Sequence, residues 1–309
     1  MTLLFISNSD DPDRWREGLG RALPDLEVRV WPEIGRAEDI RYALVWKARP
    51  GILAGLPNLE LIQSLGMGVD HIFVDPELPA TVPVARLIDQ DLVRQMSEYV
   101  LAMALRHHRR LDEYDRIQQT GDWRRLAMPD TGATRIGILG LGEIGAPIAR
   151  LFAELGFAVA GWSRTQKSIP GVESFRGAAG LSNFLARTDI LVCLLPLTKV
   201  TKNILDKTAF ARLPKGAYII NLARGQHVVE EDLLAAIEAG HLSGAALDVF
   251  RTEPLPKDHP FWAHPKIRIT PHIAGITNPA TAVAQVAENI RRVRAGHQPL
   301  NLVDRTQGY

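Results

Sequence analysis

Three side chains that could carry out acid–base chemistry each follow a short apolar, strand-like run: Arg224, Glu253 and His272. A protonated imidazole is a suitable general acid near neutral pH, and a neighbouring carboxylate favours its charged form. A guanidinium can hold a carboxylate and polarise the carbonyl beside it. Reduction of a 2-oxo acid needs such a set, because hydride adds to the carbonyl carbon while the oxygen takes a proton. Each residue alone also has a structural explanation, as a histidine beside a proline, a loop-capping arginine or a Glu-Pro turn.

A glycine-rich turn precedes these residues in the chain. Residues 136–139 are typical of a buried parallel strand, and a helix is expected over residues 146–152. Between them, Gly140, Gly142 and Gly145 have the spacing of a dinucleotide-binding turn, in which the helix N-terminus faces the phosphates. The first glycine permits the tight turn, the second lets backbone approach a pyrophosphate, and the third lets helix pack on strand. A purely structural glycine turn is the alternative.

The residues after the next strand, expected over 158–162, indicate which dinucleotide binds. NAD-binding units usually place Asp or Glu about 20 residues beyond the first glycine, where it holds the ribose 2′-hydroxyl. Here no acid lies between Leu155 and Glu173, and the segment carries Ser163, Arg164, Thr165 and Lys167. Because a guanidinium suits a 2′-phosphate, NADP(H) is preferred over NAD(H), with an ordinary solvated basic loop as the alternative.

Strand-like runs alternate with helix-like segments along the chain, which predicts parallel sheets with helices on both faces. The predicted fold class is α/β, with two doubly wound parallel-sheet domains, a Rossmann cofactor domain inserted into a flavodoxin-like substrate domain. The last helix, expected over residues 279–295, is long enough to return to the first domain. We therefore predict a substrate (catalytic) domain of residues 1–97 and 281–309 and an NADP-binding domain of residues 98–280. Ligands of such sheets gather at the carboxyl ends of strands, so the catalytic cleft is expected between the domains.

Composition and charge exclude several classes of protein. Of the 309 residues, 46% are hydrophobic, an ordinary value for a globular enzyme. The formal net charge is +1, so the protein has no overall electrostatic field that would attract nucleic acid or a membrane. The one cysteine, Cys193, cannot form an internal disulfide and lies in an apolar run, as a buried strand residue would. No apolar stretch approaches about 18 residues and no leader-like pattern opens the chain, so we expect a cytoplasmic protein without a metal site.

These motifs together resemble those of the D-isomer-specific 2-hydroxyacid dehydrogenase family over nearly the whole chain, through the glycine turn and residues 195–198, 221–225, 246–254 and 270–275. The resemblance implies that Arg224, Glu253 and His272 are catalytic. It also implies that Asp248 contacts the nicotinamide amide and that a loop at residues 195–196 lies over the cofactor. The missing acid after residue 162 departs from the NAD-using members. The predicted cofactor-binding residues are Gly140, Gly142, Glu143, Ile144, Ser163, Arg164, Thr165, Lys167, Leu195, Pro196, Ala223 and Asp248.

Residues 45–47 and 162–164, and the lack of an added regulatory domain, resemble the glyoxylate/hydroxypyruvate reductase branch of that family. The implied reaction is NADPH-dependent reduction of a small 2-oxo acid, glyoxylate or hydroxypyruvate, to the D-2-hydroxy acid, with His272 as general acid. Residues 65–70 resemble the family's substrate loop, where backbone N–H groups hold the substrate carboxylate, and Gly66 and Gly68 would allow such a nest without steric cost. The predicted substrate-binding residues are Trp46, Met67, Gly68, Arg224 and His272.

Alternatives to this reaction remain open from the sequence. A reductase of bulkier 2-oxo acids, such as phenylpyruvate or branched-chain oxo acids, fits the same motifs, as does oxidation of a D-hydroxy acid. A non-catalytic nucleotide-sensing protein could use the same scaffold. The resemblance also implies a homodimer formed through the cofactor domains. Trp123 could belong to the arm that pairs the subunits in relatives, but the sequence alone does not place it. Met96 and Tyr99, on the long helix expected over residues 90–110, are expected to be core residues.

Overall fold

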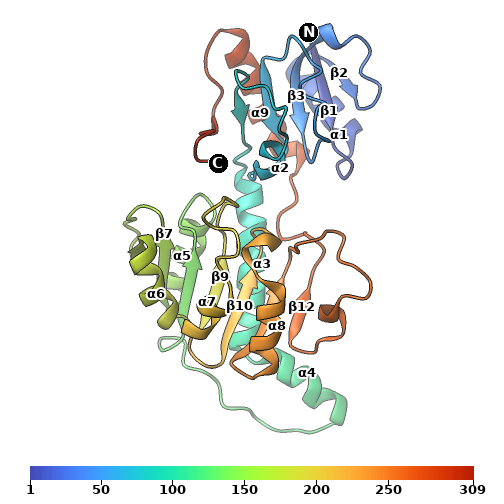
Figure 1. The fold of residues 1–309 in the computed structure, drawn as a ribbon. Helices are drawn as coiled ribbons and strands as arrows, with labels where there is room; N and C mark the ends of the chain where they lie inside the picture. Colours follow the sequence, from blue (N-terminus) through green and yellow to red (C-terminus); the bar gives the residue numbers. More distant parts are fainter. The chain divides into compact units, whose positions relative to one another are not determined.

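The computed structural model describes all 309 residues, and the chain divides into two compact units. Unit 1 comprises Met1–Leu92 and Ile276–Tyr309, and unit 2 comprises Val93–Gly275, so the second is inserted into the first. Each contains one sheet whose strands all pair in parallel (Figure 1). The predicted fold class is confirmed. The chain passes between the units at Leu92/Val93 and Gly275/Ile276, where the sequence suggested 97/98 and 280/281.

Unit 1 has a five-stranded sheet of order β2-β1-β3-β4-β5, the strand order of flavodoxin-like folds. Its strands are β1 (Thr2–Ile6), β2 (Glu27–Val30), β3 (Ile40–Val45), β4 (Leu61–Ser64) and β5 (Val84–Ala85). One face is covered by α1 (Pro12–Ala22) and α9 (Pro279–Arg294), and the other by residues 53–59 and α2 (Asp70–Phe73). Helices α1 and α9 begin at capping side chains, Asp11 and Asn278, each followed by a proline at the first helical position.

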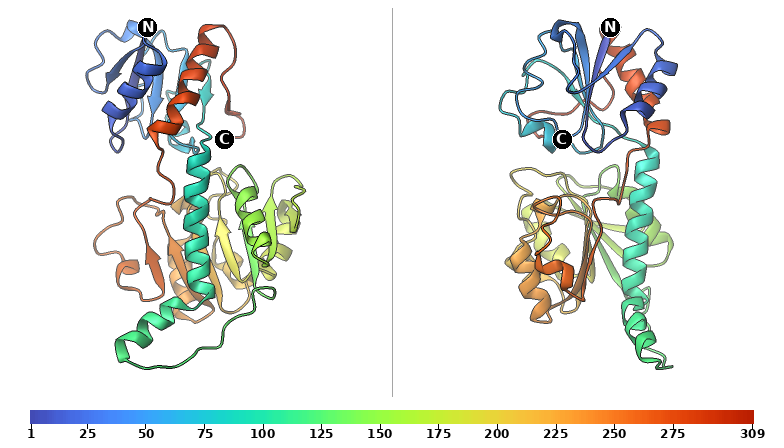
Figure 2. Two further views of the ribbon diagram at one scale, coloured as in Figure 1. Left: turned by 180° about the vertical axis from the view of Figure 1, so that it is seen from behind. Right: turned by 90° about the vertical axis from the view of Figure 1, so that its right-hand side faces the viewer.

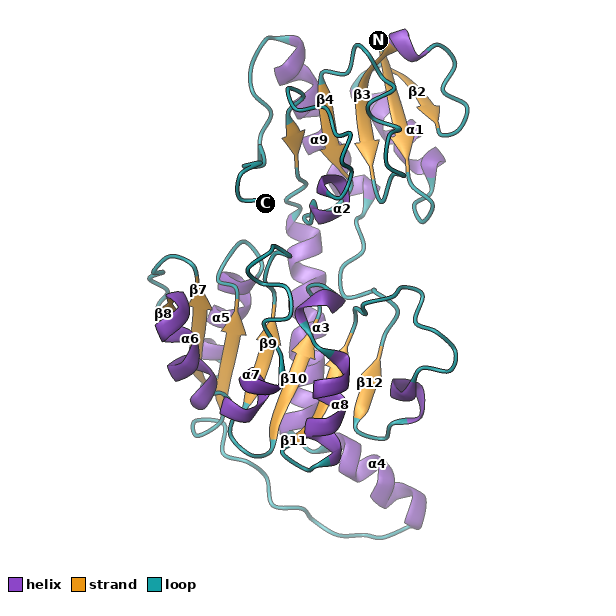
Figure 3. Cartoon of the chain, in the orientation of Figure 1, coloured by secondary structure: helices purple, strands orange, loops and turns teal.

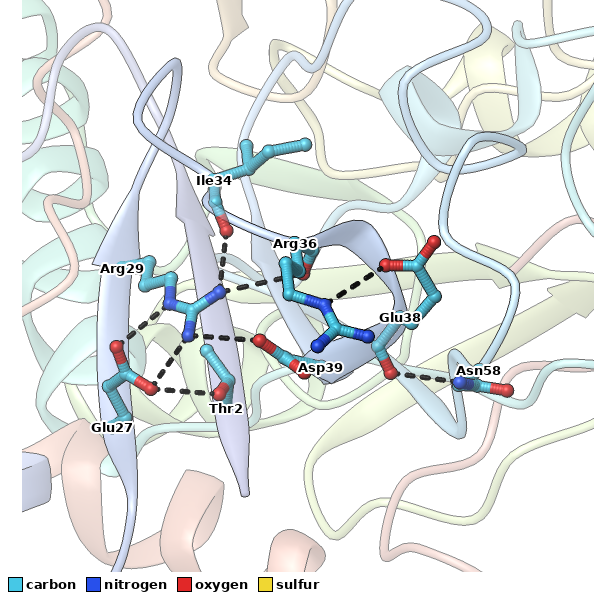
Figure 4. Close-up of polar contacts among 8 residues, drawn as sticks. All are labelled: Thr2, Glu27, Arg29, Ile34, Arg36, Glu38, Asp39 and Asn58. Atoms are coloured by element: carbon cyan, nitrogen blue, oxygen red, sulfur yellow. Dashed lines mark hydrogen bonds and ion pairs between the residues drawn. The ribbon is translucent and has the colours of Figure 1, made fainter.

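In unit 1, the side chain of Arg29 links the edge strand β2 to the short helix η1 (Ala37–Asp39) (Figure 4). Arg29 donates from Nε to Glu27 Oε1 at 2.8 Å and from Nη1 to the Ile34 carbonyl at 2.8 Å, and its Nη2 lies 3.3 Å from Asp39 Oδ2. One guanidinium thus closes the loop between β2 and β3.

Unit 2 has a seven-stranded sheet of order β12-β11-β10-β9-β6-β7-β8. Its strands are β6 (Arg135–Leu139), β7 (Ala158–Ser163), β8 (Val172–Arg176), β9 (Ile190–Cys193), β10 (Ala217–Asn221), β11 (Leu242–Leu247) and β12 (Ile267–Ile269). The chain first builds outward from β6 through β7 and β8, and then outward from β9 through β10, β11 and β12. The order therefore reverses between β6 and β9, and the carboxyl ends of neighbouring strands at such a point form the usual ligand site of α/β sheets.

Helices cover both faces of the unit 2 sheet (Figure 3). The long helix α3 (Gln90–His108) and α5 (Gly145–Glu154) contribute Val100, Ala104 and Phe152 to the core on one face. Helices α6 (Gly177–Ala186), α7 (Lys207–Arg212) and α8 (Glu230–Glu238) cover the other, and the short helices η2 (Gly225–His227) and η3 (Pro260–Ala263) lie in its loops. Figure 2 shows that α4 (Leu111–Thr120) and the chain leading to β6 extend away from this sheet.

Two elements of unit 2 were not expected from the sequence. Strand β8 is short and mostly polar, and it lies at the edge of the sheet. Helix α4 is mostly polar and has a single buried residue, Ile117. Strand β11 ends at Leu247, which places Asp248 just beyond the strand.

Candidate active site

The predicted catalytic residues follow three adjacent parallel strands of unit 2. Arg224 follows β10, Glu253 follows β11 and His272 follows β12, and these strands are neighbours in the sheet. Parallel strands end at a common edge, so the topology brings the three loops together. Strands β6 and β9, which precede the glycine turn and the Leu195-Pro196 segment, end at the same edge.

His272 and Glu253 form a direct pair. The His272 Nδ1 atom lies 2.9 Å from Glu253 Oε2, and both side chains are mostly buried. The other carboxylate oxygen of Glu253 accepts a hydrogen bond from the Phe250 N–H at 3.2 Å, which fixes the orientation of the carboxyl group. Because a carboxylate only accepts hydrogen bonds, Nδ1 carries a proton, and Nε2 is the nitrogen that remains for a substrate.

The backbone of His272 has a φ of +56°, in the left-handed region that side-chain-bearing residues rarely adopt. Its N–H donates to the Asp248 carbonyl at 2.8 Å, which holds the turn in this conformation. This conformation, at a histidine paired with a carboxylate, agrees with the predicted catalytic role.

Asp248 is 1% exposed, and its carboxylate accepts hydrogen bonds from three donors. Thr270 Oγ1 and the Ile273 N–H donate to Oδ1 at 2.6 and 2.9 Å, and the Ala274 N–H donates to Oδ2 at 2.8 Å. Burial raises the pKa of Asp248, and the three donors oppose that rise. The carboxylate therefore holds the segment that carries His272, a role that the sequence did not suggest.

Arg224 has extended backbone at the start of η2, and its Nη1 donates to the Ala223 carbonyl at 2.7 Å. The following residue must be glycine, since a Cβ on Gly225 would lie 1.9 Å from the Phe250 carbonyl carbon. The arginine loop is thus packed directly against the loop that carries Glu253. Asn221 supports it as well, donating from Nδ2 to the Arg224 carbonyl at 3.0 Å.

His227, which the sequence did not single out, connects the arginine loop to the predicted cofactor loop. It is 0% exposed, with Nδ1 at 3.1 Å from the Arg224 carbonyl oxygen and Nε2 at 3.3 Å from the Pro196 carbonyl oxygen. Thr201 Oγ1 also donates to that Pro196 carbonyl, at 2.7 Å. Leu195 and Ala223 are both buried beside these contacts, so they shape the loops through packing.

The glycine turn has the geometry that a dinucleotide requires. Gly140 has a φ of +105°, which permits the tight turn, and a Cβ on Gly145 would lie 1.7 Å from the Gly140 carbonyl oxygen. By contrast, a Cβ on Gly142 would meet no atom within 4 Å, so that part of the backbone is open to a ligand. Helix α5 begins at Gly145, Ile144 is its N-cap residue and Glu143 is exposed. The turn therefore fits a pyrophosphate at the helix N-terminus.

The basic loop after β7 is exposed at Arg164, Thr165 and Lys167, whereas Ser163 is buried and donates from Oγ to the Thr165 carbonyl at 2.7 Å. Strand β8 brings a further cation next to this loop, since Arg176 pairs with Ser163 in the strand register. The sequence analysis did not identify Arg176, because it did not predict strand β8. The first acid in this region, Glu173, forms an ion pair with Arg187.

The predicted substrate loop lies in unit 1, after β4. Ser64 Oγ accepts from the Gly66 N–H at 3.2 Å and donates to the Gly68 carbonyl at 3.0 Å. Gly66 is required by packing rather than by a left-handed φ, since a Cβ there would lie 2.9 Å from Trp46 Cζ3. The Trp46 ring packs edge-on against His71, with ring centroids 4.4 Å apart, and Met67 is partly buried.

The cysteine, possible metal ligands and possible membrane-spanning helices can be assessed in the structure as well. Cys193 is fully buried in β9, and burial raises the pKa of its thiol to about 12, so it is no nucleophile at neutral pH. No group of three or more His, Cys, Asp or Glu residues could hold a metal ion. None of the helices has the length and apolar character needed to cross a membrane.

Comparison with known proteins identifies relatives of the whole chain. Residues 101–274 match the family model of the D-isomer specific 2-hydroxyacid dehydrogenase, NAD binding domain. Glyoxylate/hydroxypyruvate reductase A of Serratia proteamaculans is 45% identical, with all of both chains covered. A D-isomer specific 2-hydroxyacid dehydrogenase of Xanthobacter autotrophicus, solved with NADPH and MES, is 43% identical with a TM-score of 0.95, covering 100% of this chain and 99% of that one. The NADPH-dependent glyoxylate/hydroxypyruvate reductase of Sinorhizobium meliloti, solved with NADP and sulfate, is 37% identical with a TM-score of 0.93 and covers all of both chains.

Proposed function

The chain belongs to the D-isomer specific 2-hydroxyacid dehydrogenase family, and we propose that within it the protein uses NADPH to reduce glyoxylate to glycolate and hydroxypyruvate to D-glycerate. The observation that carries the proposal is the 2.9 Å pair between His272 and Glu253, beside the loop of Arg224 and in the unit that carries the glycine turn. Relatives with that substrate name and with bound NADPH support it. The bulkier 2-oxo acids and the non-catalytic alternative receive no support from them.

His272, Glu253 and Arg224 have separate roles in this proposal. Bound NADPH supplies the hydride that adds to the carbonyl carbon. His272 donates the proton from Nε2 to the carbonyl oxygen, while Glu253 stabilises the imidazolium and holds the ring through Nδ1. Arg224 binds the substrate carboxylate and polarises the carbonyl.

The cofactor would be held by the turn and by the loop after β7. The open backbone at Gly142 suits the pyrophosphate, and the N-terminus of α5 favours its charge. Arg164, Thr165 and Lys167 are exposed beside Ser163, and Arg176 adds a further cation for the 2′-phosphate. Asp248 retains acceptor capacity on Oδ2 for the nicotinamide amide, as the family resemblance implies.

The substrate carboxylate would also contact backbone N–H groups of the loop at Met67 and Gly68, with Trp46 as a wall. The hydrogen bonds of Ser64 fix that loop, and the packing of Trp46 on Gly66 and His71 fixes the ring.

A homodimer through unit 2 is part of the proposal. Along α4 and the chain after it, Leu111, Trp123 and Met128 are 42, 100 and 43% exposed, and burial of these side chains in a dimer interface would be favourable. A cavity of about 590 Å³ lies beside this segment, lined by α4 residues such as Arg116 and by the amino ends of strands at Gly216 and Ser243. Sedimentation equilibrium should give a dimer, and Trp123→Ala should weaken it; a monomeric wild-type protein would contradict this part. A cytoplasmic location also belongs to the proposal and is checked by cell fractionation.

The activity is tested by following the loss of nicotinamide absorbance. NADPH and NADH are each assayed with glyoxylate, hydroxypyruvate, pyruvate and phenylpyruvate. We expect the highest kcat/KM with NADPH and glyoxylate or hydroxypyruvate, and D-glycerate as the product from hydroxypyruvate. Faster turnover of phenylpyruvate would indicate the bulkier-substrate alternative. If neither NADPH nor NADH were oxidised with any of the four acids, the reductase proposal would be wrong.

A further inference from the structure

We propose that Tyr99 and Thr270 are positioning residues that act through Asp248 to hold His272 where it can donate its proton. The inference rests on the proposed function, in which His272 is the general acid. It concerns two hydroxyl groups outside the predicted catalytic and binding residues, one of them on the long helix α3.

The two hydroxyls and the Asp248 carboxylate form a chain of hydrogen bonds with one possible direction. Thr270 Oγ1 lies 2.6 Å from Asp248 Oδ1 and 2.7 Å from the Tyr99 hydroxyl oxygen. A carboxylate only accepts, so the single Thr270 proton goes to Asp248, and the Tyr99 hydroxyl must donate to Thr270. Burial raises the pKa of Tyr99 to about 12, so this donor keeps its proton over the whole range in which enzymes are assayed. Donors in series strengthen one another, which favours the ionised Asp248.

Asp248 in turn holds the backbone around His272 at several points. Its carboxylate accepts from the Ile273 and Ala274 N–H groups, and its carbonyl accepts from the His272 N–H. These bonds stabilise the left-handed φ of +56° at His272, which is unfavourable by itself. A shift or rotation of the Asp248 carboxylate would therefore move the imidazole relative to its partner Glu253.

Tyr99 and Asp248 are each hydrogen-bonded close to a point at which the chain passes between its two units. The chain passes between its two units at Leu92/Val93, within α3, and at Gly275/Ile276, next to Ala274. Tyr99 ties the first of these connections to Thr270, and Ala274 ties the second to Asp248. Both connections thus attach, inside unit 2, to the carboxylate that fixes His272.

The test compares Tyr99→Phe and Thr270→Val, which each keep side-chain volume and remove one hydroxyl, with Thr270→Ser, which keeps the hydroxyl and loses a methyl group. Tyr42→Phe, in unit 1, and Thr188→Val, just before the amino end of β9 in unit 2, are matched controls, since each also removes a buried hydroxyl that makes a hydrogen bond. We expect kcat to fall about tenfold in Thr270→Val and about threefold in Tyr99→Phe, with KM for glyoxylate and Kd for NADPH within twofold, as for a lost hydrogen bond to a charged group. Thr270→Ser should recover most of the rate.

The pH profile gives a readout that a merely structural role would not move. The titratable groups that face Asp248 are His272, on the following loop, and Tyr99, from α3. Because the Thr270 hydrogen bond lowers the pKa of Asp248 while burial raises it, Thr270→Val should let Asp248 take up a proton at higher pH. The acidic limb of kcat should therefore move to higher pH in Thr270→Val and stay in place in Thr188→Val.

Hydrogen exchange separates failure of this inference from failure of the proposed function, since it needs no turnover. In Thr270→Val, amides of the peptide containing residues 272–275 should exchange about tenfold faster than in wild type, as loss of about 1.4 kcal/mol predicts. If the wild type reduces no 2-oxo acid but this exchange still increases, the proposed function fails and the positioning role stands. If exchange, kcat and pH profile of Thr270→Val all match those of Thr188→Val, the inference is wrong.

Discussion

Glu253 Oε2 lies 2.9 Å from His272 Nδ1, and this contact determines which ring nitrogen faces the substrate. The carboxylate is itself oriented by the Phe250 N–H, so the imidazole cannot rotate without losing its partner. With Nδ1 engaged, proton donation has to occur from Nε2.

Replacement of His272 by Gln should lower kcat by about 10²- to 10⁴-fold, the usual contribution of a positioned general acid. The affinity for NADPH should be unchanged, which fluorescence titration can measure. His297→Gln, at an exposed histidine of unit 1, is the control and should behave like wild type. A His272→Gln enzyme with normal turnover would remove His272 from the mechanism.

Replacement of Glu253 by Gln should lower kcat by about tenfold, because a neutral amide oxygen holds the Nδ1–H of His272 more weakly than a carboxylate does. KM for glyoxylate and Kd for NADPH should stay within twofold. Initial rates at saturating NADPH check this, with Glu60→Gln, at an ion pair with Arg41 in unit 1, as the control. A kcat equal to that of wild type would argue against the pair.

Replacement of Arg224 by Lys should raise KM for glyoxylate by about tenfold or more while leaving NADPH binding intact. Lysine keeps the charge but loses the planar fork that holds a carboxylate through two bonds. Initial-rate kinetics at saturating NADPH measure the effect. Equal kinetics for Arg224→Lys and wild type would mean that charge alone is used there.

Replacement of Arg164 by Ala should weaken NADPH by roughly 10- to 100-fold and NADH much less, since only NADPH presents a 2′-phosphate. Dissociation constants for both cofactors test this. Arg187→Ala removes an arginine paired with Glu173 in the same unit and should change neither constant. Arg164 does not contact the phosphate if both cofactors weaken equally.

The glycine turn offers a matched pair of substitutions. Gly142→Ala adds a methyl group to open space, so Tm should be unchanged while NADPH affinity falls. Gly145→Ala places the methyl group 1.7 Å from the Gly140 carbonyl oxygen, so Tm itself should fall. Thermal melts together with NADPH titration separate the two, and unchanged NADPH affinity in Gly142→Ala would contradict binding at this turn.

Much of the cofactor unit could be predicted because local sequence patterns determine it. The spacing of Gly140, Gly142 and Gly145 follows from backbone sterics alone, and the observed φ of Gly140 and the tight contact of Gly145 agree with it. Strands β10 and β12 begin and end where the apolar runs do. Helix α4 and strand β8 were missed, because their residues are mostly polar and their stability comes from neighbours along the sheet and chain.

The family, the two parallel-sheet units and the types of residue available for catalysis could be read from the amino-acid sequence, because strand periodicity and glycine spacing are local properties. The pairing of Glu253 with His272, the support that Asp248 gives to the same loop, and the link that His227 makes between the loops of Arg224 and Pro196 became visible in the folded chain alone. These contacts join residues from separate strand ends. Their geometry depends on strand order and register, which no local pattern specifies.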